Sequence, residues 1–246
     1  MLWKSAGLNI AVSDYVAHFR SPSGNDLDEG IFNNLLAFKT AGALIHGGVN
    51  NDQIYTGAFN DTIFGGAGAD AIWSDSGDDY INGNQGADQL EGHGGNDTIR
   101  GGKDNDYIGV APMFGGGNGQ GNDQFFGDLG NDSVDGGIDA DLLHGGKDND
   151  SMLGGEGNDT LWGDLGNDTM TGGAGADIFA FSADSGVDVI TDFAAGTDLL
   201  QVSSAVFASA SAAAAAFSNG VLNMGGGNSV SLTGVVALDA DDVVIG

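Results

Sequence analysis

Residues 65–73 read Gly-Gly-Ala-Gly-Ala-Asp-Ala-Ile-Trp, and this nonapeptide phrase decides the fold. It follows the pattern G-G-x-G-x-D-x-U-x, in which U is an apolar residue. Steps of one nonapeptide in both directions give seven units over residues 47–109 and seven more over residues 118–180. Internal repetition at a fixed period predicts a solenoid, because a single unit cannot bury its apolar residue alone.

Two positions of the unit keep their character in all fourteen copies, which is too regular for a disordered glycine-rich linker. The sixth position is always aspartate: Asp52, Asp61, Asp70, Asp79, Asp88, Asp97, Asp106, Asp123, Asp132, Asp141, Asp150, Asp159, Asp168 and Asp177. The eighth position is always apolar: Ile54, Ile63, Ile72, Ile81, Leu90, Ile99, Ile108, Phe125, Val134, Leu143, Met152, Leu161, Met170 and Phe179.

The chemistry of one unit predicts its shape. Positions one to six should form a turn, because glycine adopts positive φ without a Cβ clash. Positions seven to nine should form a short strand whose eighth side chain points inward. Two consecutive units then make one coil, and stacked coils give two parallel sheets on either side of an apolar column. We therefore predict an all-β, right-handed parallel β-roll (β-solenoid) of 14 nonapeptide repeats.

The composition restricts the ligands of the chain. Its formal net charge is −29, and all but three of its 35 acidic residues are aspartate. This charge argues against binding to nucleic acid and against unaided binding to anionic membranes. Because cysteine is absent, thiolate metal sites are excluded and hard oxygen ligands remain. No apolar run reaches transmembrane length.

Short carboxylates beside glycine turns are the ligands that calcium prefers. Aspartates two units apart lie on the same edge of the roll, in successive coils, and each such pair should help to complete an oxygen shell. The ten expected pairs are Asp52/Asp70, Asp61/Asp79, Asp70/Asp88, Asp79/Asp97, Asp88/Asp106, Asp123/Asp141, Asp132/Asp150, Asp141/Asp159, Asp150/Asp168 and Asp159/Asp177. We thus expect about ten calcium ions, whose binding contributes free energy of folding.

Over residues 47–180 the repeat resembles that of the RTX family, the secreted bacterial proteins with hemolysin-type calcium-binding repeats. In that family one turn contributes its aspartate and the carbonyls of positions two and four, and the next turn contributes its aspartate and the carbonyls of positions one and three. The resemblance implies one site formed by Gly66, Gly68, Asp70, Gly83, Gln85 and Asp88. It implies another formed by Gly155, Gly157, Asp159, Gly172, Ala174 and Asp177.

Three stretches depart from the pattern. Phe59 occupies a glycine position, which weakens the Asp61/Asp79 site, and Ser74-Asp75 replaces a Gly-Gly pair. Residues 110–117 interrupt the array and either replace one unit or bulge from an edge. In the first case Asp106 and Asp123 would form an eleventh site.

Residues 181–246 are predicted to form a β-rich cap that contains one alanine-rich helix over residues 203–217, with Ser204 as its N-cap. Strands are expected at residues 187–193, 198–202, 221–224 and 229–233. The region also resembles the C-terminal secretion signals of RTX proteins, because Asp241 to Ile245 is acidic and then apolar. That resemblance implies export by the type I secretion machinery and folding outside the cell.

Residues 1–46 suit one short amphipathic helix, with apolar residues at Ile31, Phe32, Leu35, Leu36 and Phe38. We expect this helix to cap the first coil by packing on its outward aromatic residues, Tyr55, Phe64 and Trp73. The alternative is that a second copy of the chain binds there.

The sequence contains no recognisable catalytic set. It lacks both the H-E-x-x-H zinc motif and the G-x-S-x-G nucleophile motif, and His93 and His144 lie at turn and outward positions of the repeat. The favoured interpretation is a secreted, extracellular and non-catalytic structural protein, as a matrix, surface-layer, fibre, adhesion or virion component that self-assembles. The alternative is an accessory module of a secreted enzyme or a module that binds polysaccharide. An ice-binding roll is disfavoured, because no threonine row occupies turn position three.

Overall fold

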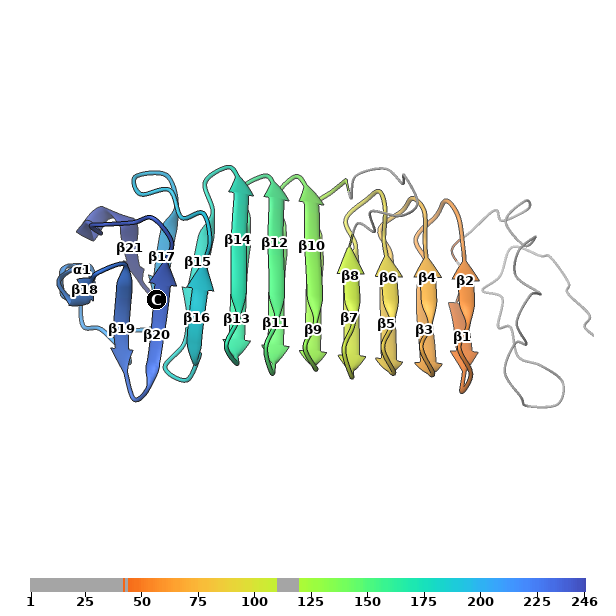
Figure 1. The fold of residues 1–246 in the computed structure, drawn as a ribbon. Helices are drawn as coiled ribbons and strands as arrows, with labels where there is room; N and C mark the ends of the chain where they lie inside the picture. Colours follow the sequence, from red (N-terminus) through yellow and green to blue (C-terminus); the bar gives the residue numbers. More distant parts are fainter. Residues whose placement is uncertain (1–41, 43, 110–119) are drawn as a thin grey trace, which may run out of the picture.

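A computed structural model of the chain describes residues 42, 44–109 and 120–246, which form a parallel β-solenoid (Figure 1). Sheet A contains β1 (Leu44–Gly48), β3 (Thr62–Ala67), β5 (Tyr80–Gln85), β7 (Thr98–Lys103), β9 (Gln124–Leu129), β11 (Leu142–Lys147), β13 (Thr160–Leu165), β15 (Ile178–Phe181), β17 (Leu199–Val202) and β21 (Val243–Ile245), in that order. Sheet B begins with β2 (Gln53–Tyr55), β4 (Ala71–Trp73), β6 (Gln89–Glu91), β8 (Tyr107–Gly109), β10 (Ser133–Ile138), β12 (Ser151–Glu156), β14 (Thr169–Ala174) and β16 (Val187–Ile190). It ends with β20 (Asn228–Leu232), β19 (Val221–Gly225) and β18 (Phe217–Ser218).

The coil of two repeats predicted from the sequence is confirmed by the strand register. Ile63 in β3 lies opposite Ile45 in β1 and Ile81 in β5, and the pairing is parallel in both cases. Odd-numbered strands enter one sheet and even-numbered strands enter the other up to β16, so each coil contributes one strand to each sheet.

The strands are longer than predicted in much of the roll. β3 and its equivalents in sheet A have six residues, because the extended backbone continues from position nine through positions one to three of the next unit. In sheet B the strands β2, β4, β6 and β8 have only three residues, whereas β10, β12 and β14 have six. In the longer strands, parallel pairing through positions one to three satisfies further backbone groups.

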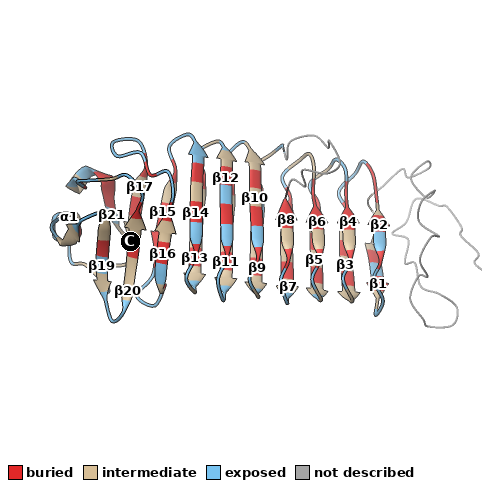
Figure 2. Ribbon diagram, viewed as in Figure 1, coloured by how far each residue is buried: buried red, intermediate tan, exposed pale blue. Residues whose placement is uncertain are grey.

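The core is the predicted apolar column. The side chains at position eight in all fourteen units are at most 2% exposed, and the alternation of buried and exposed residues along the strands follows from this inward orientation (Figure 2). At position two, Asp75, Asn84, Asp128 and Asp164 have positive φ, as expected for residue types that tolerate the left-handed region.

The register decides between the two interpretations of the interruption. Thr98 in β7 lies opposite Gln124 in β9, so the coil that contains the interruption is longer than the regular coil by eight residues. These residues have therefore been added to one coil, and no repeat has been replaced. The coils on either side keep the same two-sheet arrangement.

The C-terminal residues extend both sheets. β16, β17, β19 and β20 lie at the four stretches where strands were predicted, and β21 pairs in parallel with β17. The predicted helix is shorter than expected: α1 spans Ala210–Ala216 and has Ser209, not Ser204, as its N-cap. The preceding residues instead form a turn in which the Ser203 carbonyl accepts hydrogen bonds from Val206 and Phe207, two residues that pack against the core.

The predicted N-terminal helix lies outside the described residues. Two outward aromatic residues that it was expected to cover, Tyr55 and Trp73, stack on each other with ring centroids 4.5 Å apart. No helix in the described part of the chain is both long and apolar enough to cross a membrane.

Candidate metal centre

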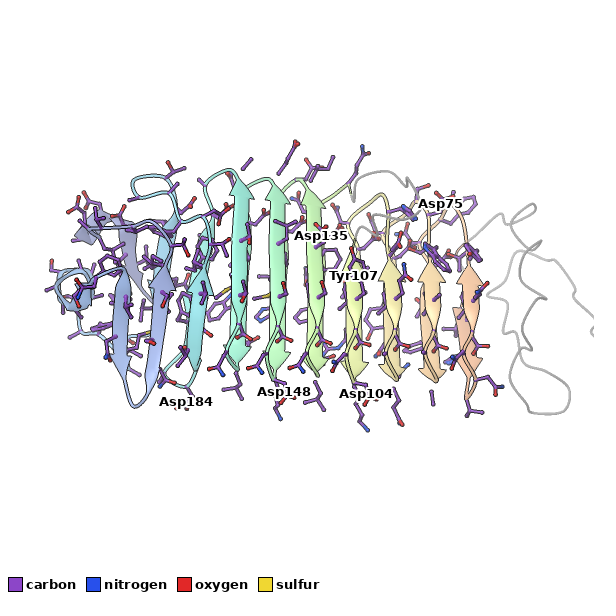
Figure 3. The ribbon with its side chains drawn as sticks, in the orientation of Figure 1. Asp75, Asp104, Tyr107, Asp135, Asp148 and Asp184 are labelled. Carbon is purple, nitrogen blue, oxygen red and sulfur yellow. The ribbon has the colours of Figure 1, made fainter. Side chains whose placement is uncertain are left out.

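The turns of the roll form two edges. Turns of the first edge lead from sheet A into sheet B, and turns of the second edge lead back from sheet B into sheet A. In Figure 3, Asp104, Asp148 and Asp184 lie on the first edge and Asp75 lies on the second.

The position-six aspartates form a continuous hydrogen-bonded ladder along each edge. Each backbone N–H donates to the Oδ1 atom of the aspartate one coil further on, for example from Asp70 to Asp88 at 2.8 Å. The first ladder is Asp52, Asp70, Asp88, Asp106, Asp132, Asp150, Asp168 and Asp188. The second ladder is Asp61, Asp79, Asp97, Asp123, Asp141, Asp159, Asp177 and Asp198. All ten pairs expected from the sequence are brought together.

The second carboxylate oxygen of most ladder aspartates is buried without a partner. Eleven of them have an Oδ2 atom that finds no hydrogen bond within the described part of the chain: Asp70, Asp88, Asp97, Asp106, Asp132, Asp141, Asp150, Asp159, Asp168, Asp177 and Asp188. A buried carboxylate oxygen is costly unless a donor or a cation compensates it. The row of unpaired oxygens therefore fits cation binding.

Burial also changes the protonation of these groups. It raises the pKa of Asp70 to about 6, that of Asp88 to about 7 and that of Asp106 to about 8. The backbone N–H bond to each carboxylate lowers the pKa, and neighbouring carboxylates raise those of Asp88 and Asp106 further. A bound cation would offset the desolvation cost and the repulsion between carboxylates, and would so lower these pKa values again.

The space next to the position-one glycine is lined by oxygen atoms. A Cβ atom at Gly154 would lie 2.5 Å from Asp159 Oδ2 and 2.6 Å from the Gly172 carbonyl of the next coil. Eight glycines have the same two oxygens beside them. One is the aspartate Oδ2 of the same turn, and the other is the position-one carbonyl of the turn one coil further along the same edge. These glycines are Gly47, Gly65, Gly83, Gly101, Gly127, Gly136, Gly145 and Gly154. Carboxylate and carbonyl oxygens facing one small space are the donor set that calcium prefers.

The carbonyls implied for the second of the two expected sites point into the gap between coils. A Cβ at Gly173 would contact the Gly155 carbonyl, and one at Gly175 would contact the Gly157 carbonyl. From the other side, the Ala174 carbonyl accepts a hydrogen bond from the Gly157 N–H at 2.8 Å. One lone pair of that oxygen is therefore already used.

The first expected site has the same arrangement. Gly83 contributes a carbonyl next to Gly65, and the Gly68 carbonyl faces Gly86. The Gln85 carbonyl accepts from the Gly68 N–H at 2.9 Å, and Gly66 lies opposite Asn84 in the register.

The interruption adds two pairs that sequence spacing did not predict. The Asp97 N–H donates to Asp123 and the Asp106 N–H donates to Asp132, both at 2.7 Å. The pairing of Asp106 with Asp123, which a replaced unit would have produced, is therefore wrong. The repeat itself contained the signal, because an insertion of eight residues shifts every later partner by eight.

The first turns of the second edge are held differently. Thr56 and Ser74 occupy position one, where a hydroxyl-bearing side chain takes the place of glycine. Thr56 Oγ1 donates to the Ser74 carbonyl at 3.1 Å, and Ser74 Oγ donates to the Gly92 carbonyl at 3.0 Å. In the eight oxygen-lined turns, the equivalent position-one carbonyl faces a glycine instead. Phe59, in the first of these turns, has φ of 111°, an uncommon conformation for a bulky residue.

Position five carries a further ladder that the sequence analysis did not recognise. Its asparagine side chains accept hydrogen bonds from the backbone N–H of position five in the next coil, as Asn149 does from Asn167 at 2.8 Å. The accepting residues are Asn51, Asn60, Asn96, Asn105, Asn122, Asn131, Asn149, Asn158 and Asn167. The recurrent Asn-Asp dipeptide was its signal in the sequence.

Side chains alone do not form a metal cluster. In the described ranges, no three His, Asp or Glu residues gather closely enough to hold an ion between them. His93 has positive φ at its turn position and lies 3.6 Å from Glu91, and His144 lies 2.9 Å from Asp164 on the outer face of sheet A.

A parallel roll with aspartate pairs and backbone carbonyls between its coils defines a calcium-binding β-roll protein. The model of the RTX calcium-binding nonapeptide repeat matches residues 46–81, 73–108, 117–152, 144–179 and 153–190, together more than half of the chain. The chain belongs to this family.

No curated protein matches the chain. Among solved structures, it is similar to the extracellular lipase LipA from Serratia marcescens, with 19% identity and a TM-score of 0.27. The match covers 85% of this chain and 40% of the lipase chain, so the chain spans less than half the length of that protein.

Proposed function

We propose that this chain binds calcium between successive turns of both edges and, at neutral pH, folds into its roll only when calcium is present. The unpaired Oδ2 atoms of the ladder aspartates, which face carbonyls across a space that a Cβ would fill, carry this proposal. Bound calcium would supply the positive charge that lets these carboxylates stay ionised while buried. The eight oxygen-lined glycine positions are the best-formed sites, in place of the ten expected from spacing alone.

We infer that the protein is secreted and has a non-catalytic structural role outside the cell. Residues 181–246 would serve as cap and type I secretion signal, residues 47–180 as the calcium-binding roll, and residues 1–46 as a cap or interaction element. The low calcium of the cell interior would keep the chain unfolded for export, and extracellular calcium would then fold it.

Light scattering and negative-stain imaging with and without calcium test the structural role. Ordered fibres or sheets that form only with calcium would support it. A calcium-loaded monomer that binds a glycan would overturn it in favour of a polysaccharide-binding module.

One surface favours that second candidate. On the outer face of sheet A, the Arg100 guanidinium lies 4.9 Å from the Phe126 ring centroid, and Phe126, His144 and Trp162 stack at 5.2 and 5.8 Å. All three lysine and arginine residues in the described ranges lie in β7 and β11. Arg100 is on this face, and Lys103 and Lys147 are the last residues of these strands.

A groove over Gly146 lies between Asp128 and Asp164, with Phe126 and Leu165 on its walls. Carboxylates flanked by apolar side chains can bind saccharide hydroxyls and ring carbons. Titration of glycans into the calcium-loaded protein, followed by calorimetry in wild type and Trp162→Ala, tests this candidate. Equal binding by both proteins would exclude this face.

A further inference from the structure

The last turn of the first edge lies in the cap, beyond the fourteen units. Residues 183–188 read Ala-Asp-Ser-Gly-Val-Asp, which keeps glycine at position four and aspartate at position six. Asp184 of this turn lies on the same edge as Asp104 and Asp148 (Figure 3). Gly186 has φ of 100°, within the range of the repeat glycines.

The contacts of the repeat recur in this turn, although its spacing is two residues longer than that of a regular coil. The Asp168 N–H donates to Asp188 Oδ1 at 3.1 Å, and the Val189 N–H donates to the Asp168 carbonyl at 2.9 Å. The Val187 N–H donates to Asn167 Oδ1 at 2.9 Å, which continues the position-five ladder. The turn therefore stacks on the roll as a further repeat.

Three buried oxygens gather here without a hydrogen-bond partner in the described part of the chain: Asp168 Oδ2, Asp188 Oδ2 and Ser185 Oγ. Asp188 is fully buried, and Asp168 and Ser185 are at most 2% exposed. Burial raises the pKa of Asp188 to about 6, and the neighbouring Ser185 hydroxyl lowers it.

Backbone carbonyls complete the surroundings. A Cβ at Gly186 would contact the Gly166 carbonyl, and the Ser185 carbonyl accepts from the Gly166 N–H at 3.1 Å. One ligand of the repeat pattern is altered, because the Ala183 carbonyl accepts a hydrogen bond from Asn228 Nδ2 at 2.6 Å. The Ser185 hydroxyl, beside the Asp188 carboxylate, is a further oxygen in this turn.

The second edge ends in a closed arrangement. Asp177 donates its N–H to Asp198 Oδ1, but Asp198 Oδ2 already accepts from the Ala194 N–H at 2.7 Å. A Cβ at Gly172 would lie 2.9 Å from the Phe179 ring, whereas Gly136 and Gly154 have a carbonyl oxygen near the equivalent position. An ion at this end would meet a satisfied carboxylate and an aromatic ring.

We propose that Asp168 and Asp188, together with the oxygens of Ser185 and the Gly166 carbonyl, form a further calcium site that joins the roll to the C-terminal cap. Asp177 and Asp198 form no such site. This inference rests on the proposed calcium binding of the repeats. β16, which contains Asp188, pairs with β20, and Asn228 at the start of β20 bonds to Gly186 and Ala183. The ion would therefore stabilise the cap as well as the last coil.

Native mass spectrometry of the calcium-loaded full chain tests the proposal through Asp188→Asn and the matched control Asp198→Asn. Asparagine keeps the Oδ1 acceptor of each ladder bond and replaces the second oxygen with an N–H donor, which cannot bind a cation. We expect Asp188→Asn to bind one calcium ion fewer than wild type and Asp198→Asn to bind the same number. Ser185→Ala should bind the last ion more weakly while the chain remains folded.

Hydrogen exchange over residues 183–190 provides a second readout. In wild type and in Asp198→Asn, we expect these amides to gain protection as calcium is added, and in Asp188→Asn that gain should be lost. Unchanged ion counts and protection in both Asp188→Asn and Ser185→Ala would refute the site. A wild-type chain that binds no calcium at all would instead refute the proposed function.

Discussion

The two edges of the roll use the same aspartate ladder but different residues at position one. From Gly47 to Gly163, every turn of the first edge begins with glycine, whereas the second edge begins with Thr56 and Ser74 before glycine returns. At the first-edge glycines from Gly47 to Gly145 a carboxylate and a carbonyl oxygen face each other across an open space. At Thr56 and Ser74 a hydroxyl fills that space and donates to the same carbonyl.

We infer from this difference that the side chain at position one decides what holds a turn to the next coil. In the proposed sites a glycine leaves room for a cation between coils. At Thr56 and Ser74 a hydroxyl instead donates a hydrogen bond across the same gap. The irregular turns that begin at Thr56 and Ser74 are separated by one whole coil, and so both fall on the second edge. The two edges therefore differ in position-one chemistry within one fold.

Removal of calcium should have the largest effect, and it should affect both edges. With a chelator at pH 8, the ionised ladder aspartates would repel one another with no cation between them, so we expect loss of most β-structure by circular dichroism. Calcium should restore the signal, and magnesium should not, because it prefers a small octahedral shell with several waters. A roll that keeps its spectrum without calcium would contradict the role of the ladders.

Acid should partly replace calcium. The pKa is raised to about 8 for Asp106 and Asp150 on the first edge and for Asp97 and Asp141 on the second, mainly by burial. Because these values exceed those of the unfolded chain, the folded state binds more protons, and its stability without metal falls as pH rises from about 4 to 8.

We therefore expect more β-structure at pH 5 than at pH 8 in chelator. Calcium binding at neutral pH should release protons, which calorimetry in buffers of different ionisation enthalpy would measure. Equal structure at both pH values, or binding without proton release, would show that these carboxylates do not have raised pKa values. Since both edges carry raised values, hydrogen exchange should show no difference between the edges in this response.

A methyl group at position one of the first edge should remove one site. In Gly145→Ala the Cβ would lie 2.5 Å from Asp150 Oδ2 and 2.9 Å from the Gly163 carbonyl. We expect the loss of one calcium ion and a cost of roughly 2–3 kcal/mol, the scale of leaving buried polar groups uncompensated. Gly94→Ala on the second edge is the matched control, since no described atom lies within 4 Å of its Cβ. Similar losses in both variants would contradict the assignment of the space at Gly145 to an ion.

The reverse change should create a site on the second edge. With Thr56→Gly and Phe59→Gly, residues 56–61 would read Gly-Gly-Ala-Gly-Asn-Asp, as in the regular turns. We expect the double variant to bind one more calcium ion than wild type by native mass spectrometry. Thr56→Val, which removes the hydroxyl but keeps the Cβ, should bind the wild-type number. An unchanged count in the double variant would mean that position one does not control the site.

The sequence was sufficient for the parts of the molecule that obey the period. The inward column and the ten aspartate pairs followed from the nonapeptide spacing, because residues two units apart must stack once each coil has two strands. The sequence was insufficient where a coil has a different number of residues from the regular coil. Asp188 and Asp198 continue the ladders at separations of 20 and 21 residues, and Asp132 pairs with Asp106 across the insertion. The helix was expected to begin at residue 203, but α1 begins at Ala210. Val206 and Phe207 pack against the core, and this packing outweighs the alanine-rich composition.

Removal of one asparagine ladder bond should have the smallest effect, and the cost in stability should be the same on both edges. Asn149 on the first edge accepts from the Asn167 N–H, and Asn158 on the second accepts from the Ala176 N–H, both at 2.8 Å. Each bond joins two coils without a cation, so Asn149→Ala and Asn158→Ala should each cost about 1 kcal/mol, the usual contribution of one hydrogen bond. Thermal unfolding in saturating calcium would measure both, and ion counts should not change. A larger loss on one edge, or a loss of calcium, would mean that position five also shapes the metal sites and that the two edges differ there too.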